Sequence, residues 1–371
     1  MEIDKQAHKM IIAYVIAKFE EEEGLEPLNW RRLIEGGIFE FFHRIILTDI
    51  KPPVYHQLIK QSGEKLNTWV LEKLKNRVDA VQGGFYENFQ RYLLDDTFCK
   101  REKKILRASH YLATNWEFKI IYNLNRNIYG VEETKNKIEN ELEVHSSLVG
   151  VQKLAPGENI YNFIDLVGQL RFQKRWAHSP RVPETSVLGH MLIVAVLAYL
   201  LSLELSACDK RASNNFYTGL FHDLPEVLTR DIISPIKRAV EGLDNLIKEI
   251  ELKQVEERIL PLLPQGWHRE IRYYVLDEFK SKIIAEEKVK TIQADEINKH
   301  YNEDRFSPVD GEIIKGCDDF AAYIEAFLSI SHGISSHHLR DALTSLYAKY
   351  ENKIIGGVDF GQLFDYFSLP S

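Results

Sequence analysis

The side chains best suited to chemistry gather in one short segment. His222 and Asp223 are adjacent, and Glu226 and Asp231 follow shortly after. Imidazole and carboxylate groups together are typical ligands of borderline divalent ions such as Mn, Co, Ni, Fe or Zn. On a continuous helix, Glu226 would share one face with His222 and Asp223, because it lies four and three residues beyond them. The segment is therefore a candidate metal site with a further carboxylate beside it.

Two more candidate ligands lie far from this segment. His190 begins the apolar stretch that runs from Met191 to Leu201, and Asp318 precedes a second apolar stretch. A histidine on an apolar helix is usually a core residue, so His190 alone predicts little. A carboxylate at the edge of an apolar helix is costly to bury unless a metal or a hydrogen-bond partner compensates it. Asp295 is the alternative to Asp318 as the last ligand.

Other kinds of catalysis find little support. No Gly-rich P-loop is present, which argues against chemistry driven by ATP. The three cysteines, Cys99, Cys208 and Cys317, are far apart and form no CxxC pair, so neither a zinc ribbon nor a thioredoxin-type site is indicated. Sparse cysteines predict reduced thiols in a cytoplasm.

The composition restricts the kind of protein and partner. The chain has 371 residues, of which 44% are hydrophobic and 27% charged, values typical of a folded protein with about two domains. A formal net charge of −8 argues against a nucleic-acid polymer as partner, but it allows a small anion in a locally basic pocket. No signal peptide is evident, and the longest apolar run falls short of the ~18 residues of a membrane helix.

Helical periodicity dominates the sequence and predicts an all-α fold. The expected helices cover residues 8–20, 66–79, 103–123, 190–206, 240–261 and 318–330. The Pro-Gly pair at 156–157 follows an irregular stretch and marks a turn. We therefore predict two domains, residues 1–150 and residues 151–371. The candidate ligands all lie in the second.

The pattern His190, His222-Asp223, Asp318 resembles the signature of the HD-domain metal-dependent phosphohydrolases. The flanking residues resemble one branch, the YfbR-like bacterial 5′-deoxyribonucleotidases. Arg175-Trp176 stands ahead of His190 as an Arg-Trp pair does in that branch, and the resemblance covers about residues 160–345. Three runs carry it: Arg175-Trp176, His222 to Lys237, and Ile314 to Tyr323.

The resemblance implies roles for individual residues. The implied metal ligands are His190, His222, Asp223 and Asp318. The implied catalytic residues are Glu226, which would orient or deprotonate a metal-bound water, and Asp231, which would bind near the ribose. The implied substrate-binding residues are Arg175, whose guanidinium suits a phosphate, Trp176, which would pack near the sugar or base, and Lys237.

An internal repeat connects the two halves of the chain. With an offset of 182, His8 aligns with His190, and Glu40-Phe41 aligns with His222-Asp223. With an offset of 208, His110 aligns with Asp318, which favours Asp318 over Asp295. Since phenylalanine cannot bind a metal, we predict that residues 1–150 are a degenerate, metal-free HD copy. The alternative is a residual metal site formed by His8, Glu40 and His110.

These features predict an enzyme that uses a divalent metal ion (Mn, Co, Ni, Fe, Zn or Mg) to hydrolyse the phosphomonoester of (deoxy)nucleoside 5′-monophosphates. The alternatives are a hydrolase for another small phosphate ester and a nucleotide-sensing regulatory protein. The aromatic run from Phe360 to Leu369 would dock either on the body of the protein or on a second subunit, which would give a homodimer.

Overall fold

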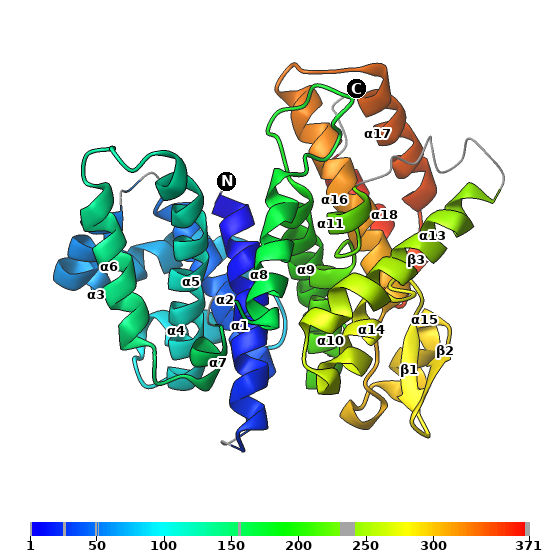
Figure 1. The fold of residues 1–371 in the computed structure, drawn as a ribbon. Coiled ribbons are helices and arrows are strands. Elements are labelled where there is room, and N and C mark those ends of the chain that lie inside the picture. The colour runs from blue at the N-terminus through cyan, green and yellow to red at the C-terminus, as the bar shows by residue number, and fades with distance from the viewer. Residues whose placement is uncertain are drawn as a thin grey trace. The chain divides into compact units, whose positions relative to one another are not determined.

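The computed structural model describes residues 2–24, 27–48, 50, 52–154, 157–230 and 242–367, and these are mostly helical (Figure 1). The predicted all-α class is confirmed. Strands in the described part amount to two short antiparallel hairpins, β1 (Lys282–Ala285) with β2 (Lys288–Thr291) and β3 (Ile354–Ile355) with β4 (Val358–Asp359). The chain divides into two compact units, Met1–Ala155 and Pro156–Ser371, and the division lies close to the expected boundary.

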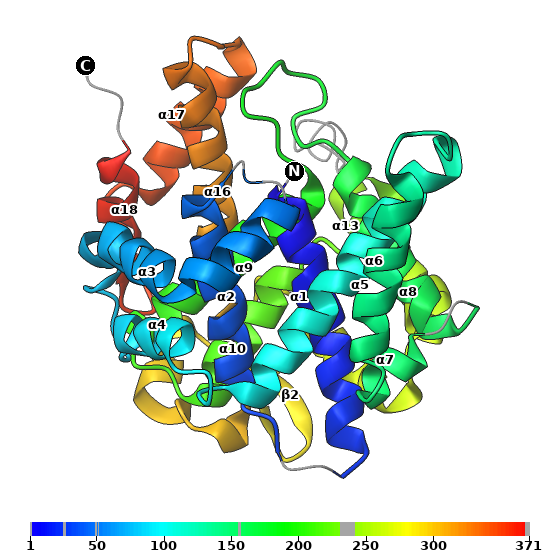
Figure 2. The same ribbon diagram turned by 90° about the vertical axis from the view of Figure 1, so that its left-hand side faces the viewer.

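The first unit is built around one apolar helix. Residues 10–17 of α1 are fully buried or nearly so, and α1 packs against α2, α5 and α7 (Figure 2). The helices of this unit are α1 (Glu2–Glu22), α2 (Trp30–Ile46), α3 (Pro52–Val78), α4 (Phe85–Leu94), α5 (Lys100–Leu124), α6 (Val131–Val144) and α7 (Val149–Lys153).

The second unit contains more and shorter helices. Single 3₁₀ or π turns occupy residues 169–172, 255–262, 265–267, 297–301 and 304–306. The α-helices among the described residues are α8 (Asn159–Gly168), α9 (Val187–Glu204), α10 (Asp209–Phe221), α11 (Glu226–Thr229), α13 (Leu243–Gln254), α14 (His268–Val275), α15 (Ala294–Glu296), α16 (Gly311–Ser331), α17 (His337–Tyr350) and α18 (Phe360–Tyr366).

Helix α9 is the core of the second unit. Helix α9 is long and apolar enough to cross a membrane. However, 67% of it is buried inside the protein, as is usual for a core helix. It packs against α10 and α16. A Cβ on Gly219 of α10 would lie 2.8 Å from the Ala195 Cα of α9, so a glycine is required for the two helices to approach this closely.

A buried ion pair fixes the start of α16 on α10. The Arg211 guanidinium donates to both carboxylate oxygens of Asp310, at 2.7 and 2.8 Å, and both residues are 0% exposed. The Asn215 side chain also donates to Asp310 at 2.6 Å, and its amide oxygen accepts from the Asp310 backbone N–H at 2.8 Å. These bonds satisfy a charge pair that would otherwise be expensive to bury.

The C-terminal aromatic residues dock on the body of the second unit. The Phe364 ring lies 5.1 Å from the ring of Phe320 and 4.8 Å from the rings of Tyr323 and Tyr350. Phe360 and Phe364 are both fully buried. The end of the predicted run, residues 368 and 369, lies outside the described residues. The homodimer remains a prediction.

The two units share a pattern of packing. Helices α1, α2 and α5 contact one another in the first unit, as α9, α10 and α16 do in the second. Gly37 aligns with Gly219, and a Cβ on Gly37 would lie 2.2 Å from the Met10 Sδ of α1. Each unit therefore has a glycine where these two helices meet, although at Gly37 the close neighbour is the end of a flexible side chain and at Gly219 it is backbone. This supports the predicted repeat, which remains a proposal.

The Arg211–Asp310 pair predicts a large effect on stability. Asp310→Asn leaves the Arg211 charge uncompensated in the core, and we expect a loss of about 3–5 kcal/mol. Urea unfolding measures it. The matched control is Glu303→Gln, which removes the partner of the exposed Arg305 and should cost below about 1 kcal/mol. Equal losses for the two variants would contradict the structural role of the pair.

Candidate metal centre

Three side chains from three helices converge in the second unit. His190 comes from α9, His222 follows the last residue of α10, and Asp318 comes from α16. One donor atom of each lies within 4.8 Å of the others, and no second such group occurs among the described residues. His190 Nε2 is 2.9 Å from Asp318 Oδ1, and the two imidazole centroids are 5.4 Å apart. The two histidines are buried.

A backbone hydrogen bond fixes the orientation of the His222 imidazole. Its Nδ1 donates to the Gly219 carbonyl at 2.8 Å, which leaves Nε2 directed at the site. That nitrogen is 3.1 Å from Asp223 Oδ2. Asp223 is thus beside the three-residue group, although it is not part of it. The structure brings together all four residues that the sequence indicated as ligands.

The predicted shared helix face of His222, Asp223 and Glu226 is wrong. Helix α10 ends at Phe221, residues 222–225 form a turn, and Glu226 begins the separate helix α11. Pro225 causes the break, because its ring excludes the carbonyl of the residue four before it and it has no N–H to donate. Glu226 nevertheless lines the same cavity as His222 and Asp223, a hollow of about 670 Å³.

The carboxylates of this site favour a positive charge beside them. Burial alone would lower the pKa of His222, but Asp223 and Asp318 outweigh it and raise that pKa to about 9. Burial would raise the pKa of Asp318, yet Lys315 and His190 hold it well below the usual value. A divalent cation would supply the positive charge that a proton on His222 otherwise provides. The donor set of imidazoles and carboxylates fits Mn, Co, Ni, Fe or Zn.

Arg175 and Trp176 are held beside the site by a residue that the sequence analysis missed. Glu325 accepts hydrogen bonds from Arg175 Nε at 3.3 Å, Trp176 Nε1 at 2.8 Å and Thr185 Oγ1 at 2.5 Å. The other end of the guanidinium reaches toward the candidate ligands, with Nη1 3.8 Å from Asp223 Oδ2. Arg175 thus bridges the Glu325 anchor and the candidate centre.

Glu325 lies two helical turns after Asp318 on α16, so both face the same side. Its Oε1 is also 3.9 Å from His190 Nδ1. Burial by itself raises the pKa of Glu325, but the charges of Arg175, His190 and Arg181 and the Thr185 hydroxyl outweigh it and bring the pKa to about 2. The signal that could have found Glu325 is a lone acid in an apolar run, spaced seven residues after a candidate ligand.

The remaining candidates lie elsewhere. Asp295 is exposed on α15 and lines a different cavity, so the structure brings Asp318 and not Asp295 to the two histidines. Asp231 and Lys237 lie outside the described residues.

In the first unit, His8, Glu40 and His110 align with His190, His222 and Asp318. Among the described residues they do not form a similar group of possible metal ligands. The Glu40 carboxylate forms an ion pair with the buried Lys9 ammonium and accepts from Tyr92 Oη at 2.6 Å. The His8 ring packs edge-on against Trp116, with centroids 4.9 Å apart. An internal ammonium therefore neutralises the carboxylate that aligns with His222.

Comparison with known proteins agrees with this geometry. Residues 167–347 match the family model described as an HD domain. A 5′-deoxynucleotidase of Pasteurella multocida is 24% identical over 185 residues, which cover 47% of this chain and 77% of that protein. A 5′-deoxynucleotidase of Vibrio vulnificus is 27% identical over 175 residues, covering 46% and 76%. One of Pectobacterium atrosepticum is 27% identical over 143 residues, covering 37% and 68%. The predicted resemblance is confirmed.

Metal analysis separates the two candidate last ligands. We expect one divalent ion per chain, because only the second unit gathers suitable donors among its described residues. Asp318→Ala should weaken binding by more than about 100-fold, whereas Asp295→Ala should leave affinity unchanged. Equilibrium dialysis with elemental analysis measures both. Two ions per chain, or a loss with Asp295→Ala alone, would contradict the assignment.

The Glu325 carboxylate predicts a pH-dependent stability. Its pKa falls from 4.5 to about 2 in the folded state, so its contribution is fully present above pH 4.5 and is lost as the pH falls toward 2. A shift of this size corresponds to about 3 kcal/mol. The difference in unfolding free energy between wild type and Glu325→Gln, measured in urea, should shrink below pH 4.5. A difference that does not depend on pH would contradict the ionised state of Glu325.

Proposed function

We propose that the second unit, of which residues 167–347 match an HD-domain family model, hydrolyses the phosphomonoester of (deoxy)nucleoside 5′-monophosphates. The similar proteins are 5′-deoxynucleotidases, which suggests the reaction class, and the site contains groups that fit this reaction. The observation that carries the proposal is the convergence of His190, His222 and Asp318 donors within 4.8 Å of one another, with the Arg175 guanidinium alongside.

We propose that His190, His222, Asp223 and Asp318 hold a divalent ion. Such an ion lowers the pKa of water and offsets negative charge on phosphoryl oxygens. The second-unit residues around it have separate tasks. The Gly219 carbonyl orients His222, and Glu325 keeps Arg175 in place.

Arg175 is the proposed phosphate-binding residue. Its Nε is committed to Glu325, while the other end of the guanidinium points toward Asp223. A planar guanidinium can donate two parallel bonds to a phosphate. Since Arg175 is only 13% exposed, its attraction for an anion is screened less than that of a surface arginine.

Glu226 is the proposed proton acceptor for the attacking water. It is 8% exposed and lines the cavity that also contains His222 and Asp223. Gln173 fixes the local backbone, because its amide donates to the Glu226 carbonyl at 3.0 Å. Asp231 keeps its proposed catalytic role near the ribose and Lys237 its proposed substrate-binding role, and Trp176 is proposed to border the sugar or base.

Phosphate release from a panel of nucleoside 5′-monophosphates tests the proposal. We expect release with Mn, Co or Mg, abolition by a chelator, and a preference for the 2′-deoxy series. Phosphate release only from other small phosphate esters would instead identify the protein as a hydrolase for such an ester. No release from any ester by folded, metal-loaded protein would contradict the enzymatic proposal and favour a nucleotide-sensing role.

The role of Arg175 predicts a kinetic change. Arg175→Gln removes a charged donor to the phosphoryl group, so kcat/KM should fall at least about 100-fold. Lys174→Gln is the matched control, since the neighbouring Lys174 forms an exposed pair with Glu184; it should retain wild-type kinetics. Steady-state kinetics with the preferred substrate measures both. An unchanged kcat/KM for Arg175→Gln would remove Arg175 from the proposed site.

A further inference from the structure

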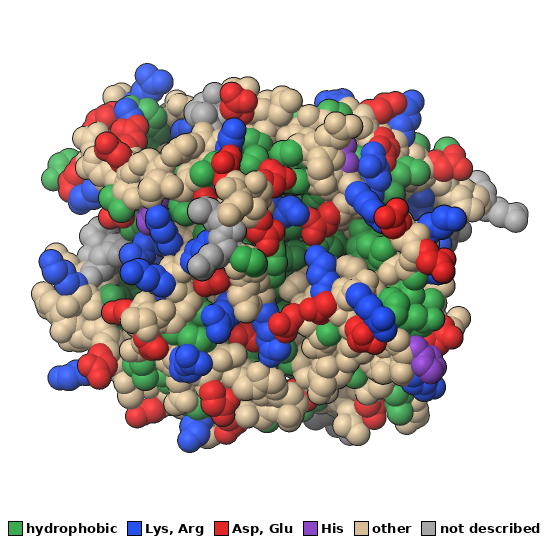
Figure 3. All heavy atoms as spheres, turned by 90° about the horizontal axis from the view of Figure 1, so that it is seen from below, with side chains coloured by type: hydrophobic (Ala, Val, Ile, Leu, Met, Phe, Trp, Pro, Cys, Tyr) green, Lys and Arg blue, Asp and Glu red, His purple; other side chains and the backbone are tan. Residues whose placement is uncertain are grey.

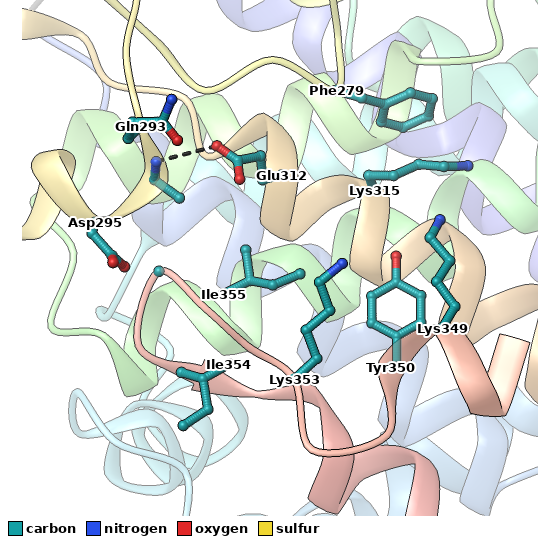
Figure 4. Close-up of a pocket in the computed structure, with 12 residues that line it drawn as sticks. Phe279, Gln293, Asp295, Glu312, Lys315, Lys349, Tyr350, Lys353, Ile354 and Ile355 are labelled. Atoms are coloured by element: carbon teal, nitrogen blue, oxygen red, sulfur yellow. Dashed lines mark hydrogen bonds between the residues drawn. The ribbon is translucent and has the colours of Figure 1, made fainter.

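A second cavity lies next to the candidate metal centre, on the far side of Lys315 and Phe279. It has a volume of about 300 Å³, at the lower end of the ~300–1,000 Å³ range of small-molecule sites. Lys315 and Phe279 line both cavities. The remaining walls come from α15, α17, β3 and the start of α16 (Figure 4).

Three ammonium groups and one phenol gather in this cavity. Lys349 Nζ lies 5.1 Å and Lys353 Nζ 5.3 Å from the Tyr350 ring centroid. Lys315 Nζ lies 4.7 Å from the Phe279 ring. Figure 4 shows the Lys349 and Lys353 side chains and the Tyr350 hydroxyl extending toward Lys315.

Asp319 contacts two of these lysines and the phenol. Its carboxylate, on a residue only 8% exposed, accepts from Tyr350 Oη at 2.8 Å and from Lys349 Nζ, and lies 3.0 Å from Lys315 Nζ. The Tyr350 side chain is itself 1% exposed. A buried carboxylate and phenol therefore hold two lysines in fixed positions, unlike the mobile lysines of an open surface.

The three lysines of this cavity are neutralised to different extents. Lys315 contacts the carboxylates of Asp318, at 2.7 Å, and of Asp319, and Lys349 contacts Asp319, whereas Lys353 forms no ion pair among the described residues. A cation bound to Asp318 would increase the local positive potential further. The acids Asp295 and Glu312 also line the cavity; Figure 4 shows Asp295 on the opposite side from Lys349. The Glu312 carboxylate accepts from the Ala294 N–H at 3.2 Å and retains its negative charge.

We propose that this cavity binds a phosphate group, free or esterified, between Lys315, Lys349 and Lys353. Lysine ammoniums bind phosphate as compact point charges, and the three converge from different elements on one small space. The Tyr350 hydroxyl adds a polar group at its base. The site goes beyond the proposed hydrolysis, because its lysines are separate from Arg175 and the cavity is distinct from the one that contains Glu226.

Calorimetric titration of chelator-treated protein tests this site without turnover. Inorganic phosphate is the first probe and deoxyadenosine 5′-monophosphate the second, at constant ionic strength. We expect Lys349→Gln/Lys353→Gln to weaken binding at least about tenfold. The double variant Lys288→Gln/Lys290→Gln on exposed β2 should bind as wild type does. Circular dichroism checks that both variants are folded.

The outcomes separate this site from the hydrolytic one. Arg175→Gln should retain phosphate binding, and Lys349→Gln/Lys353→Gln should retain metal-dependent hydrolysis. If the nucleotide binds and this binding depends on Lys349 and Lys353, the ligand is an esterified phosphate. If only inorganic phosphate shows such lysine-dependent binding, the ligand is free phosphate. Equal affinities in wild type and Lys349→Gln/Lys353→Gln, or no binding of either probe to wild type, would overturn the proposal. Failure to hydrolyse any ester would not affect it.

Discussion

The candidate centre depends on the packing of α9, α10 and α16, because His190 lies on α9, Asp318 on α16, and His222 directly after the last residue of α10. The buried Arg211–Asp310 pair fixes α16 against α10 at its first residues, and Gly219 lets α10 approach α9 closely. Asp318 lies about two turns beyond Asp310 on the same rigid helix. A shift of α16 along α10 would therefore separate Asp318 from His190. Stability and site geometry are set by the same contacts.

Charge compensation explains the surroundings of the centre. Glu325 is balanced by Arg175, and Asp318 by Lys315. The first unit follows the same rule with a different solution, since the Lys9 ammonium balances Glu40. A fixed internal cation makes a metal unnecessary there. This contrast is the physical reason to propose that the first unit is a metal-free copy.

The sequence predicted the helical class and the clustered donors because both have local signals. Apolar periodicity marks α9 and α16, and His222-Asp223 is a motif with a specific context. The prediction failed at Pro225, which is itself a local helix breaker, and at the β1–β2 hairpin of residues 282–291, which has no clear alternation. Glu325 was missed because its partners come from a loop about 140–150 residues away in the sequence, a separation that no local pattern reveals.

X-ray absorption spectroscopy of the protein loaded with one equivalent of Mn or Co tests the central claim most directly. The account predicts two imidazole nitrogens and further oxygen ligands around the ion, and the loss of one imidazole contribution in His222→Ala. The control His268→Ala changes a histidine that bonds the Leu263 carbonyl and should leave the spectrum unchanged. An ion surrounded by oxygen alone, or an identical spectrum for His222→Ala, would contradict the account.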